Sequence, residues 1–312
     1  MPNPPRLKAS DFDPEVLRLF DQYVHGAIDR RGFLAGAARF AVGAAGAAGL
    51  LAALSPQFAA AQQVKPDDKG LVAKYIEFAS PQGYGTARGY LARPAKAHGP
   101  LPAVLVAHEN RGLNPHIEDI TRRLALADFI AFAPDALFPL GGYPGDEDKA
   151  RALFGQLDQA KTREDFVAAA GMLAGIEGGN GRLGAVGFCY GGGIANFLAT
   201  RLPHLAAAAP FYGAPPPLED VPKIKAELLV VLAANDERIN ANWPAYEAAL
   251  KAANVRYTLF QPAGTQHGFN NDTTPRYDEL AAKEAWARTL VLFNRTLREG
   301  KHAGDEHAKG KQ

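Results

Sequence analysis

The residue with the clearest chemical potential is Cys189, the only cysteine among the 312 residues. It lies in the run Gly187-Phe188-Cys189-Tyr190-Gly191. A nucleophile held on a tight turn from a strand into a helix leaves no room for flanking side chains, so glycine is needed on both sides. The N-terminus of the following helix would also favour the thiolate. The pattern predicts a nucleophilic cysteine; the alternative is an inert, buried cysteine in a glycine-rich turn.

No other residue type competes well for the role of nucleophile. The serines are Ser10 and Ser55, which lie in a segment that we expect to be removed, and Ser80, which lies outside any such turn. A solitary cysteine also excludes an intramolecular disulfide, a CxxC redox pair and a zinc site made of cysteines. The thiol therefore has to be explained by itself.

A candidate acid and a candidate base follow the cysteine along the chain. Asp236 comes after the expected strand 228–233, and His267 comes after the expected strand 255–260. In α/β-hydrolases the order is nucleophile, acid, histidine, and the loops leave the sheet at its carboxyl edge, where sites form. His267 would take the thiol proton and return it to the leaving group, while Asp236 would fix the imidazole tautomer. Asp236 could instead cap a loop, with Glu237 as the neighbour most able to replace it.

The other seven histidines are poorer candidates because of their positions. Some belong to the N-terminal segment, an early loop or the tail, and others precede the acid or lie too close to the cysteine. They are His25, His98, His108, His116, His204, His302 and His307.

Short β-branched runs alternate with longer segments of helical apolar spacing after residue 62. This alternation predicts an α/β protein of the α/β-hydrolase type, with about eight mostly parallel strands and helices on both faces. The expected strands are 72–78, 88–92, 103–107, 130–133, 183–188, 206–211, 228–233 and 255–260. The expected helices are 115–127, 147–157, 163–176, 190–201, 242–252 and 276–298.

The N-terminal segment resembles a twin-arginine export signal. Arg30 and Arg31 precede a weakly hydrophobic stretch, 35–54, and the small residues 59–61 offer a cleavage site. We expect residues 1–61 to be removed after Ala61 and the folded product to work in the periplasm. The alternatives are an N-terminal core helix or an uncleaved anchor.

Composition limits the remaining possibilities. The formal net charge is +1 and 47% of the residues are hydrophobic, so a sizeable core is available, and no global field would gather nucleic acid or an anionic membrane. We expect one domain at 62–300, a flexible polar tail at 301–312, and a small neutral or mildly charged substrate. No membrane span is expected after cleavage.

The sequence from about 71 to 297 resembles the dienelactone hydrolase family, also called carboxymethylenebutenolidases. The resemblance rests on the cysteine motif, on the phrase His108-Glu109-Asn110-Arg111-Gly112, and on spacing: Asp236 follows Cys189 by 47 residues, and His267 follows Asp236 by 31. It implies a cofactor-free hydrolase of carboxylic esters or lactones.

The resemblance also implies roles for residues around the nucleophile. Glu109 would contact the resting thiol, and the backbone N–H groups of Asn110 and Tyr190 would form the oxyanion hole. A carboxylate beside a thiol disfavours a second negative charge, so Glu109 would keep the sulfur protonated. His108 and Glu109 could instead form a hydrogen-bonded loop; a metal site would need two more clustered ligands.

The substrate is less defined by the sequence than the reaction. Family members that act on dienelactone grip its carboxylate with arginines, one soon after the histidine, whereas 268–271 hold none here. Lys149 and Arg151 lie in the region of the second arginine. Two other functions are alternatives: a binding or redox-responsive protein in which Cys189 senses oxidants, and a peptidase, for which the chain offers no propeller or large cap.

Overall fold

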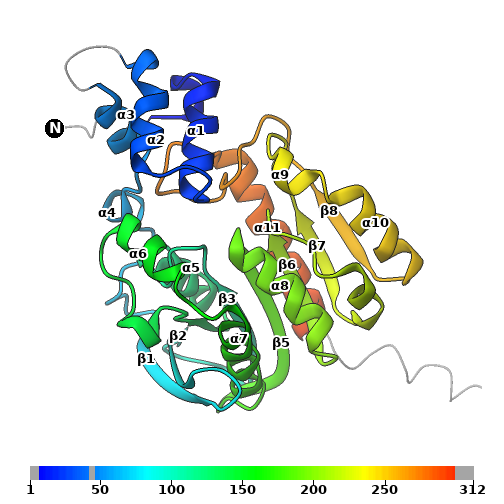
Figure 1. The fold of residues 1–312 in the computed structure, drawn as a ribbon. Coiled ribbons are helices and arrows are strands. Elements are labelled where there is room, and N and C mark those ends of the chain that lie inside the picture. The colour runs from blue at the N-terminus through cyan, green and yellow to red at the C-terminus, as the bar shows by residue number, and fades with distance from the viewer. Residues whose placement is uncertain (1–6, 42–45, 299–312) are drawn as a thin grey trace, which may run out of the picture.

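The structure, a computed structural model, describes residues 7–41 and 46–298; the expected tail at 301–312 lies outside this part. It contains an eight-stranded sheet in the order β1-β2-β4-β3-β5-β6-β7-β8 (Figure 1). The first strand pairs antiparallel with the second, the second pairs antiparallel with β4, and the other pairs are parallel. The strands are β1 (Leu71–Ser80), β2 (Gly85–Pro94), β3 (Leu101–Ala107), β4 (Ile130–Pro134), β5 (Gly179–Phe188), β6 (Leu205–Phe211), β7 (Glu227–Val231) and β8 (Tyr257–Phe260).

Helices cover both faces of this sheet, which confirms the predicted α/β-hydrolase fold. One apolar cluster packs α6, α7, α8 and α10 on one face, and a second packs α5 and α11 on the other. The central strand β3 is buried along its whole length, as expected of a parallel strand covered on both sides. The helices of this body are α5 (Pro115–Leu126), α6 (Glu147–Phe154), α7 (Gln159–Ala174), α8 (Tyr190–Arg201), α9 (Glu237–Asn240), α10 (Trp243–Ala252) and α11 (Glu279–Arg298), with short 3-10 turns η3 (Phe138–Leu140) and η4 (Leu218–Lys223).

The N-terminal segment folds into a small helical layer with an apolar cluster of its own. Asp13 caps the first helix and Pro14 occupies its first turn, while residues with helical spacing, among them Val16 and Phe20, turn inward onto Phe33 and Leu54. Figure 1 shows this layer above the body of the protein. Its elements are η1 (Ala9–Asp11), α1 (Pro14–Val24), α2 (Arg30–Ala37), η2 (Ala38–Phe40), α3 (Gly46–Leu54) and α4 (Phe58–Ala61).

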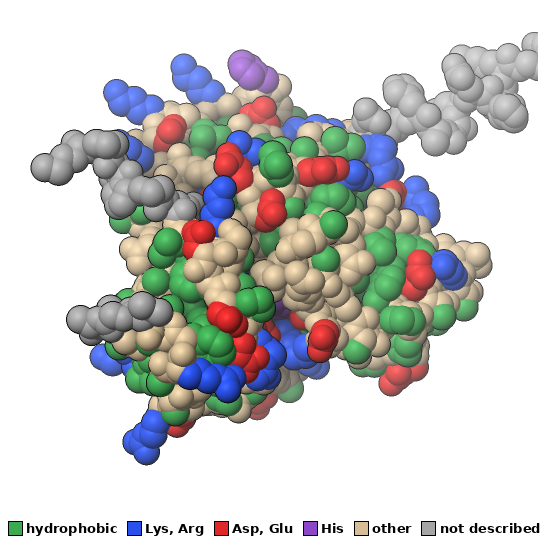
Figure 2. Space-filling model, turned by 90° about the horizontal axis from the view of Figure 1, so that it is seen from above, with side chains coloured by type: hydrophobic (Ala, Val, Ile, Leu, Met, Phe, Trp, Pro, Cys, Tyr) green, Lys and Arg blue, Asp and Glu red, His purple; other side chains and the backbone are tan. Residues whose placement is uncertain are grey.

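Among the described residues, no helix is both long enough and apolar enough to cross a membrane. Figure 2 looks down on the molecule from above and shows acidic and basic side chains interspersed on that face. The mixture agrees with the near-neutral net charge of the chain.

Candidate active site

Cys189 lies on a strained turn between β5 and α8. Its backbone has φ 54° and ψ −112°, a conformation that residues with a side chain rarely adopt. The flanking glycines are required by contact: a Cβ on Gly187 would lie 1.9 Å from the Gly191 carbonyl oxygen, and one on Gly191 would lie 2.0 Å from that of Ala107. The predicted sharp elbow is therefore present, with its sulfur at the start of a helix.

The predicted acid and base meet in two loops beyond β7 and β8. His267 Nδ1 lies 2.5 Å from Asp236 Oδ2, and both side chains are buried. The other carboxylate oxygen of Asp236 accepts a hydrogen bond from the Ile239 N–H at 3.3 Å, so the residue also caps α9. A bridge between Asn235 and Gln266 ties the loops together. Asp236 therefore caps a helix with one carboxylate oxygen and contacts His267 with the other, so the loop cap leaves the predicted role of triad acid available.

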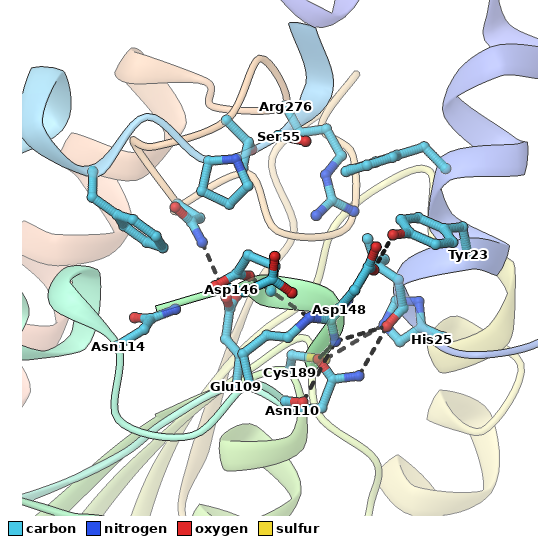
Figure 3. Close-up of a pocket in the computed structure, with 18 of the residues that line it drawn as sticks. Tyr23, His25, Ser55, Glu109, Asn110, Asn114, Asp146, Asp148, Cys189 and Arg276 are labelled. Atoms are coloured by element: carbon cyan, nitrogen blue, oxygen red, sulfur yellow. Dashed lines mark hydrogen bonds and ion pairs between the residues drawn. The ribbon is translucent and has the colours of Figure 1, made fainter. Parts of the chain in front are cut away.

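A second histidine, which position along the chain had made a poor candidate, contacts the nucleophile. His25 Nε2 lies 3.5 Å from Cys189 Sγ, and the His25 ring lies edge-on to His267 with 4.7 Å between ring centroids. Its other nitrogen, Nδ1, is 3.2 Å from a carboxylate oxygen of Asp21. Figure 3 shows His25 entering the site from the N-terminal layer. The sulfur thus faces two imidazole rings, each backed by a carboxylate.

Hydrogen bonds fix the end of α1 over the nucleophile. The Val24 carbonyl accepts from Asn110 Nδ2 and from Arg111 Nη1, both at 3.0 Å. One residue earlier, the Tyr23 carbonyl accepts from Arg151, and the Tyr23 hydroxyl donates to Asp148. The loop that follows β3 therefore holds the backbone next to His25 directly.

The two rings change the ionisation of the thiol. Burial alone would raise the pKa of Cys189, but the positive charge available on His267 and His25 outweighs it and holds that pKa at about 5. For His267, burial lowers the pKa, but Cys189 and Asp236 raise it to about 10. Between these values the favoured state is a thiolate beside an imidazolium.

Comparison with known proteins identifies the family to which this site belongs. The model of the dienelactone hydrolase family matches residues 87–297. The chain belongs to the dienelactone hydrolase family. It is therefore a hydrolase, as the resemblance implied. A separate model, described as YqhI-like, matches residues 3–42.

Curated relatives and a solved structure also match this chain. A protein of Escherichia coli (strain K12) with the provisional name carboxymethylenebutenolidase is 31% identical over 245 residues, which are 74% of this chain and 89% of the relative. The hydrolase fragment YghX of the same organism is 56% identical over 105 residues, 34% of this chain and 90% of the fragment. A crystal structure from Klebsiella pneumoniae, provisionally a dienelactone hydrolase, has a TM-score of 0.64 at 32% identity and covers 72% of this chain and 99% of its own. More than a quarter of the present chain has no counterpart in it.

The predicted effect of Glu109 on the thiol stays a prediction, and the structure shows where its carboxylate lies. Glu109 lines the cavity beside Cys189, but its carboxylate accepts a hydrogen bond from Asn271 Nδ2 at 3.0 Å, and the hydrogen-bonding contact of the sulfur is with His25. The lowered pKa of Cys189 also disagrees with a neutral resting thiol. The two imidazoles favour the thiolate, whereas the Glu109 carboxylate would disfavour it. The imidazoles outweigh burial and hold the pKa of Cys189 below its usual value.

His108 belongs to the protein interior rather than to the reacting groups. It is buried; its Nδ1 lies 2.6 Å from the Glu109 carbonyl oxygen, and its Nε2 accepts from the Ala136 N–H at 3.2 Å. Burial lowers its pKa to about 4, so the ring stays neutral. His108 therefore takes part in a hydrogen-bonded loop, one of the interpretations that the sequence offers for His108-Glu109.

Two cavities meet at the sulfur, and Cys189, His25 and Asn110 border both. The first, of about 360 Å³, is walled jointly by the N-terminal layer and the body and carries charged side chains. The second, of about 330 Å³, is mostly apolar. Charged residues of the first are Arg30, Glu109, Arg111, Asp146, Glu147, Asp148 and Arg276. Apolar residues of the second include Ile194, Phe197, Tyr212, Pro215, Pro216, Pro217 and Ile239.

A more distant arginine lines the charged cavity: Arg276 lies nine residues beyond His267. Its Nε and Nη1 atoms are buried and make no hydrogen bond to any described residue, and Nη1 lies 3.6 Å from a carboxylate oxygen of Asp21. Arg151 donates to the Tyr23 carbonyl. Sequence spacing missed Arg276 because the loop turns back over the site only in the folded chain.

Proposed function

We propose that this protein hydrolyses carboxylic esters or lactones by nucleophilic catalysis at Cys189, with His267 as base and Asp236 as the acid that orients it. The observation that carries the proposal is a cysteine on a strained, glycine-flanked elbow next to a buried histidine–aspartate pair. The names of the relatives support the substrate class. The relative from Escherichia coli (strain K12) carries the provisional name carboxymethylenebutenolidase, which is the name of a lactone hydrolase.

The reaction follows from the ionisation of the site. The thiolate adds to the carbonyl carbon, and the carbonyl electrons move to oxygen, where the backbone N–H groups of Asn110 and Tyr190 would stabilise them. Protonated His267 gives its proton to the departing alkoxide as the C–O bond breaks, leaving a thioester. Neutral His267 then takes a proton from water, whose oxygen attacks the thioester, and Cys189 leaves as the thiolate. The acid product and the original ion pair result.

The two cavities support a small substrate with two chemically different halves. Because both open at Cys189, a scissile carbonyl at the sulfur would place one substituent in the charged cavity and the other in the apolar cavity. A closed lactone, whose two ends are joined, would instead occupy mainly one of them.

Hydrolysis of short p-nitrophenyl esters by the purified full chain tests this proposal. We expect turnover that iodoacetamide abolishes, with one carboxymethyl group found on Cys189 by mass spectrometry. Turnover that survives complete alkylation of Cys189 would rule out the assigned nucleophile. Alkylation in a protein that hydrolyses neither esters nor lactones would favour a redox-responsive or binding role.

We further propose that the precursor is exported by the twin-arginine machinery and that the protein works in the periplasm. The paired Arg30 and Arg31 and the small residues before Gln62 support this. Replacement of both arginines by lysine should trap the protein in the cytoplasm, and N-terminal sequencing of the periplasmic product should begin near Gln62. If His25 acts in the site, a product that retains the N-terminal layer would be the competing result.

A further inference from the structure

The atoms that face one another at the centre of the site are the kind that bind metals. Cys189 Sγ and one nitrogen each of His25 and His267 all lie within 4.8 Å of one another, and the Sγ to His25 Nε2 distance is 3.5 Å. Tetrahedral zinc with one sulfur and two nitrogen ligands separates the ligand atoms by roughly 3.3 to 3.6 Å. The three groups therefore need only small movements to surround one ion.

Each histidine also has the outer partner that a metal-binding imidazole requires. Nδ1 of His267 is held by the Asp236 carboxylate, whereas Nδ1 of His25 lies 2.8 Å from the Asp21 backbone carbonyl oxygen and 3.2 Å from a carboxylate oxygen of the same residue. A carboxylate or backbone carbonyl behind a ligating histidine fixes its tautomer and makes it a better metal ligand. Nε2 of His267 is buried and makes no hydrogen bond to any residue that the structure describes. This nitrogen is therefore available to coordinate a metal ion.

We propose that Cys189, His25 and His267 form a site for a divalent zinc ion, with a fourth position open to the cavities. Thiolate and imidazole are the ligands that zinc prefers, and three protein ligands with one open position complete its usual coordination. Binding joins the sulfur and both Nε2 lone pairs to the ion and releases to solvent any proton that the rings carried. Because the nucleophile and its base are then occupied, zinc inhibits the proposed hydrolysis.

One side chain, Arg238, already contacts a nitrogen that zinc would bind, and it can move away into solvent. Arg238 Nη2 lies 3.1 Å from His25 Nε2, but Arg238 is exposed and lies at the border of the apolar cavity. When the His25 ring is neutral, the guanidinium can donate to the same lone pair that zinc would use. Movement of this side chain into solvent frees the nitrogen without a change in the backbone.

Metal binding by the full chain, freed of metal with a chelator, is the test. Calorimetry should show one zinc ion per chain, and bound zinc should protect Cys189 from iodoacetamide. Cobalt as a substitute should give a thiolate-to-metal charge-transfer band that disappears on prior alkylation of the cysteine. Failure to protect the thiol, or cobalt binding without that band, would overturn the proposal.

Variants distinguish a three-ligand zinc site that includes His25 from zinc binding by Cys189 and His267 alone. His25→Ala should weaken zinc binding by about 100-fold or more, and Asp21→Asn, which keeps the backbone carbonyl at His25 Nδ1 and removes only the carboxylate charge beside it, should weaken it by about 10-fold. His98→Ala, at an exposed histidine of a distant loop, is the matched control and should bind as the unaltered chain does. Unchanged affinity in both His25→Ala and Asp21→Asn would show that the N-terminal layer does not contribute to the ion. Ester hydrolysis by the metal-free chain is measured separately, so loss of one proposal leaves the other standing.

Discussion

The two sides of the site are built in different ways. On the side of the sheet, Cys189 and the His267–Asp236 pair follow strand ends, and their backbones are fixed by glycine contacts, a helix cap and a bridge between loops. On the other side, His25 is held at the end of one short helix by a few hydrogen bonds to the loop after β3. The sheet holds the proposed reacting groups with little freedom to move, whereas the N-terminal layer adds a second imidazole beside the thiol and helps to shape the approach to it.

The largest effect is expected on the side of the sheet. Cys189→Ala should lower ester turnover by about 1000-fold or more, because the nucleophile is lost while the turn retains its glycines. Initial rates and a circular dichroism spectrum measured on the same preparation check both parts. Turnover above about a hundredth of that of the unaltered chain would remove Cys189 from its assigned role.

Asp236→Asn should lower turnover by about 100- to 10,000-fold, because an amide cannot fix the His267 tautomer or stabilise its charge. The asparagine oxygen can still accept from the Ile239 N–H, so the helix cap should survive. Glu237→Gln, at the adjacent exposed carboxylate, is the control. Equal losses in the two variants would mean that local structure, and not the partner of His267, determines the rate.

His25→Ala tests the other side of the site. The ring lowers the pKa of Cys189, so its removal should raise that pKa above about 5 and slow alkylation at pH values between the old and the new pKa. At higher pH, where the thiol is ionised in both proteins, the rates should converge. The pH dependence of iodoacetamide reaction measures this shift, and overlapping profiles would show that His25 does not influence the sulfur.

Glu109→Gln should give the smallest change. Removal of a nearby negative charge would lower the pKa of the thiol further and speed alkylation at acidic pH, but the carboxylate is hydrogen-bonded to Asn271 and the two histidines dominate the sulfur. The same alkylation profile measures it. A larger change in the pKa of Cys189 than His25→Ala produces would show that Glu109, rather than His25, has the main influence on the ionisation of the thiol.

Much of the side of the sheet could be predicted because its signals are local. The glycines around Cys189 are required by contacts within a few residues, and the positions of Asp236 and His267 follow from the order of the strands. Alternation of strand and helix was sufficient for the fold. The helix predicted for 276–298 begins at Glu279 in the structure. The loop after His267 is therefore three residues longer than the spacing of apolar residues predicts.

The part of the site that the N-terminal layer contributes could not be predicted, because it depends on how residues 7–41 and 46–61 pack against the rest of the protein. The paired arginines at 30 and 31 gave a reason to set the whole segment aside. A signal was nevertheless present: Asp13 and Pro14 start an amphipathic helix, and Asp21 and His25 are four residues apart on one face of its last turn. That pattern indicates a folded helix carrying an oriented imidazole, but only tertiary contact reveals that the ring reaches Cys189. Arg276 was missed for the same reason.

The short helix α4 bears on the timing of any processing. A peptidase binds its substrate as an extended strand, yet Ala61 is buried in this helix, and the backbone on either side is tied down: the Gln57 N–H donates to Thr273, and the N–H groups of Gln63 and Val64 donate to Asp119. The bond after Ala61 can be cut only before these contacts form or during a local opening that breaks them. Processing and docking of the segment are therefore competing events, and the ratio of their rates would decide what fraction of molecules keeps His25.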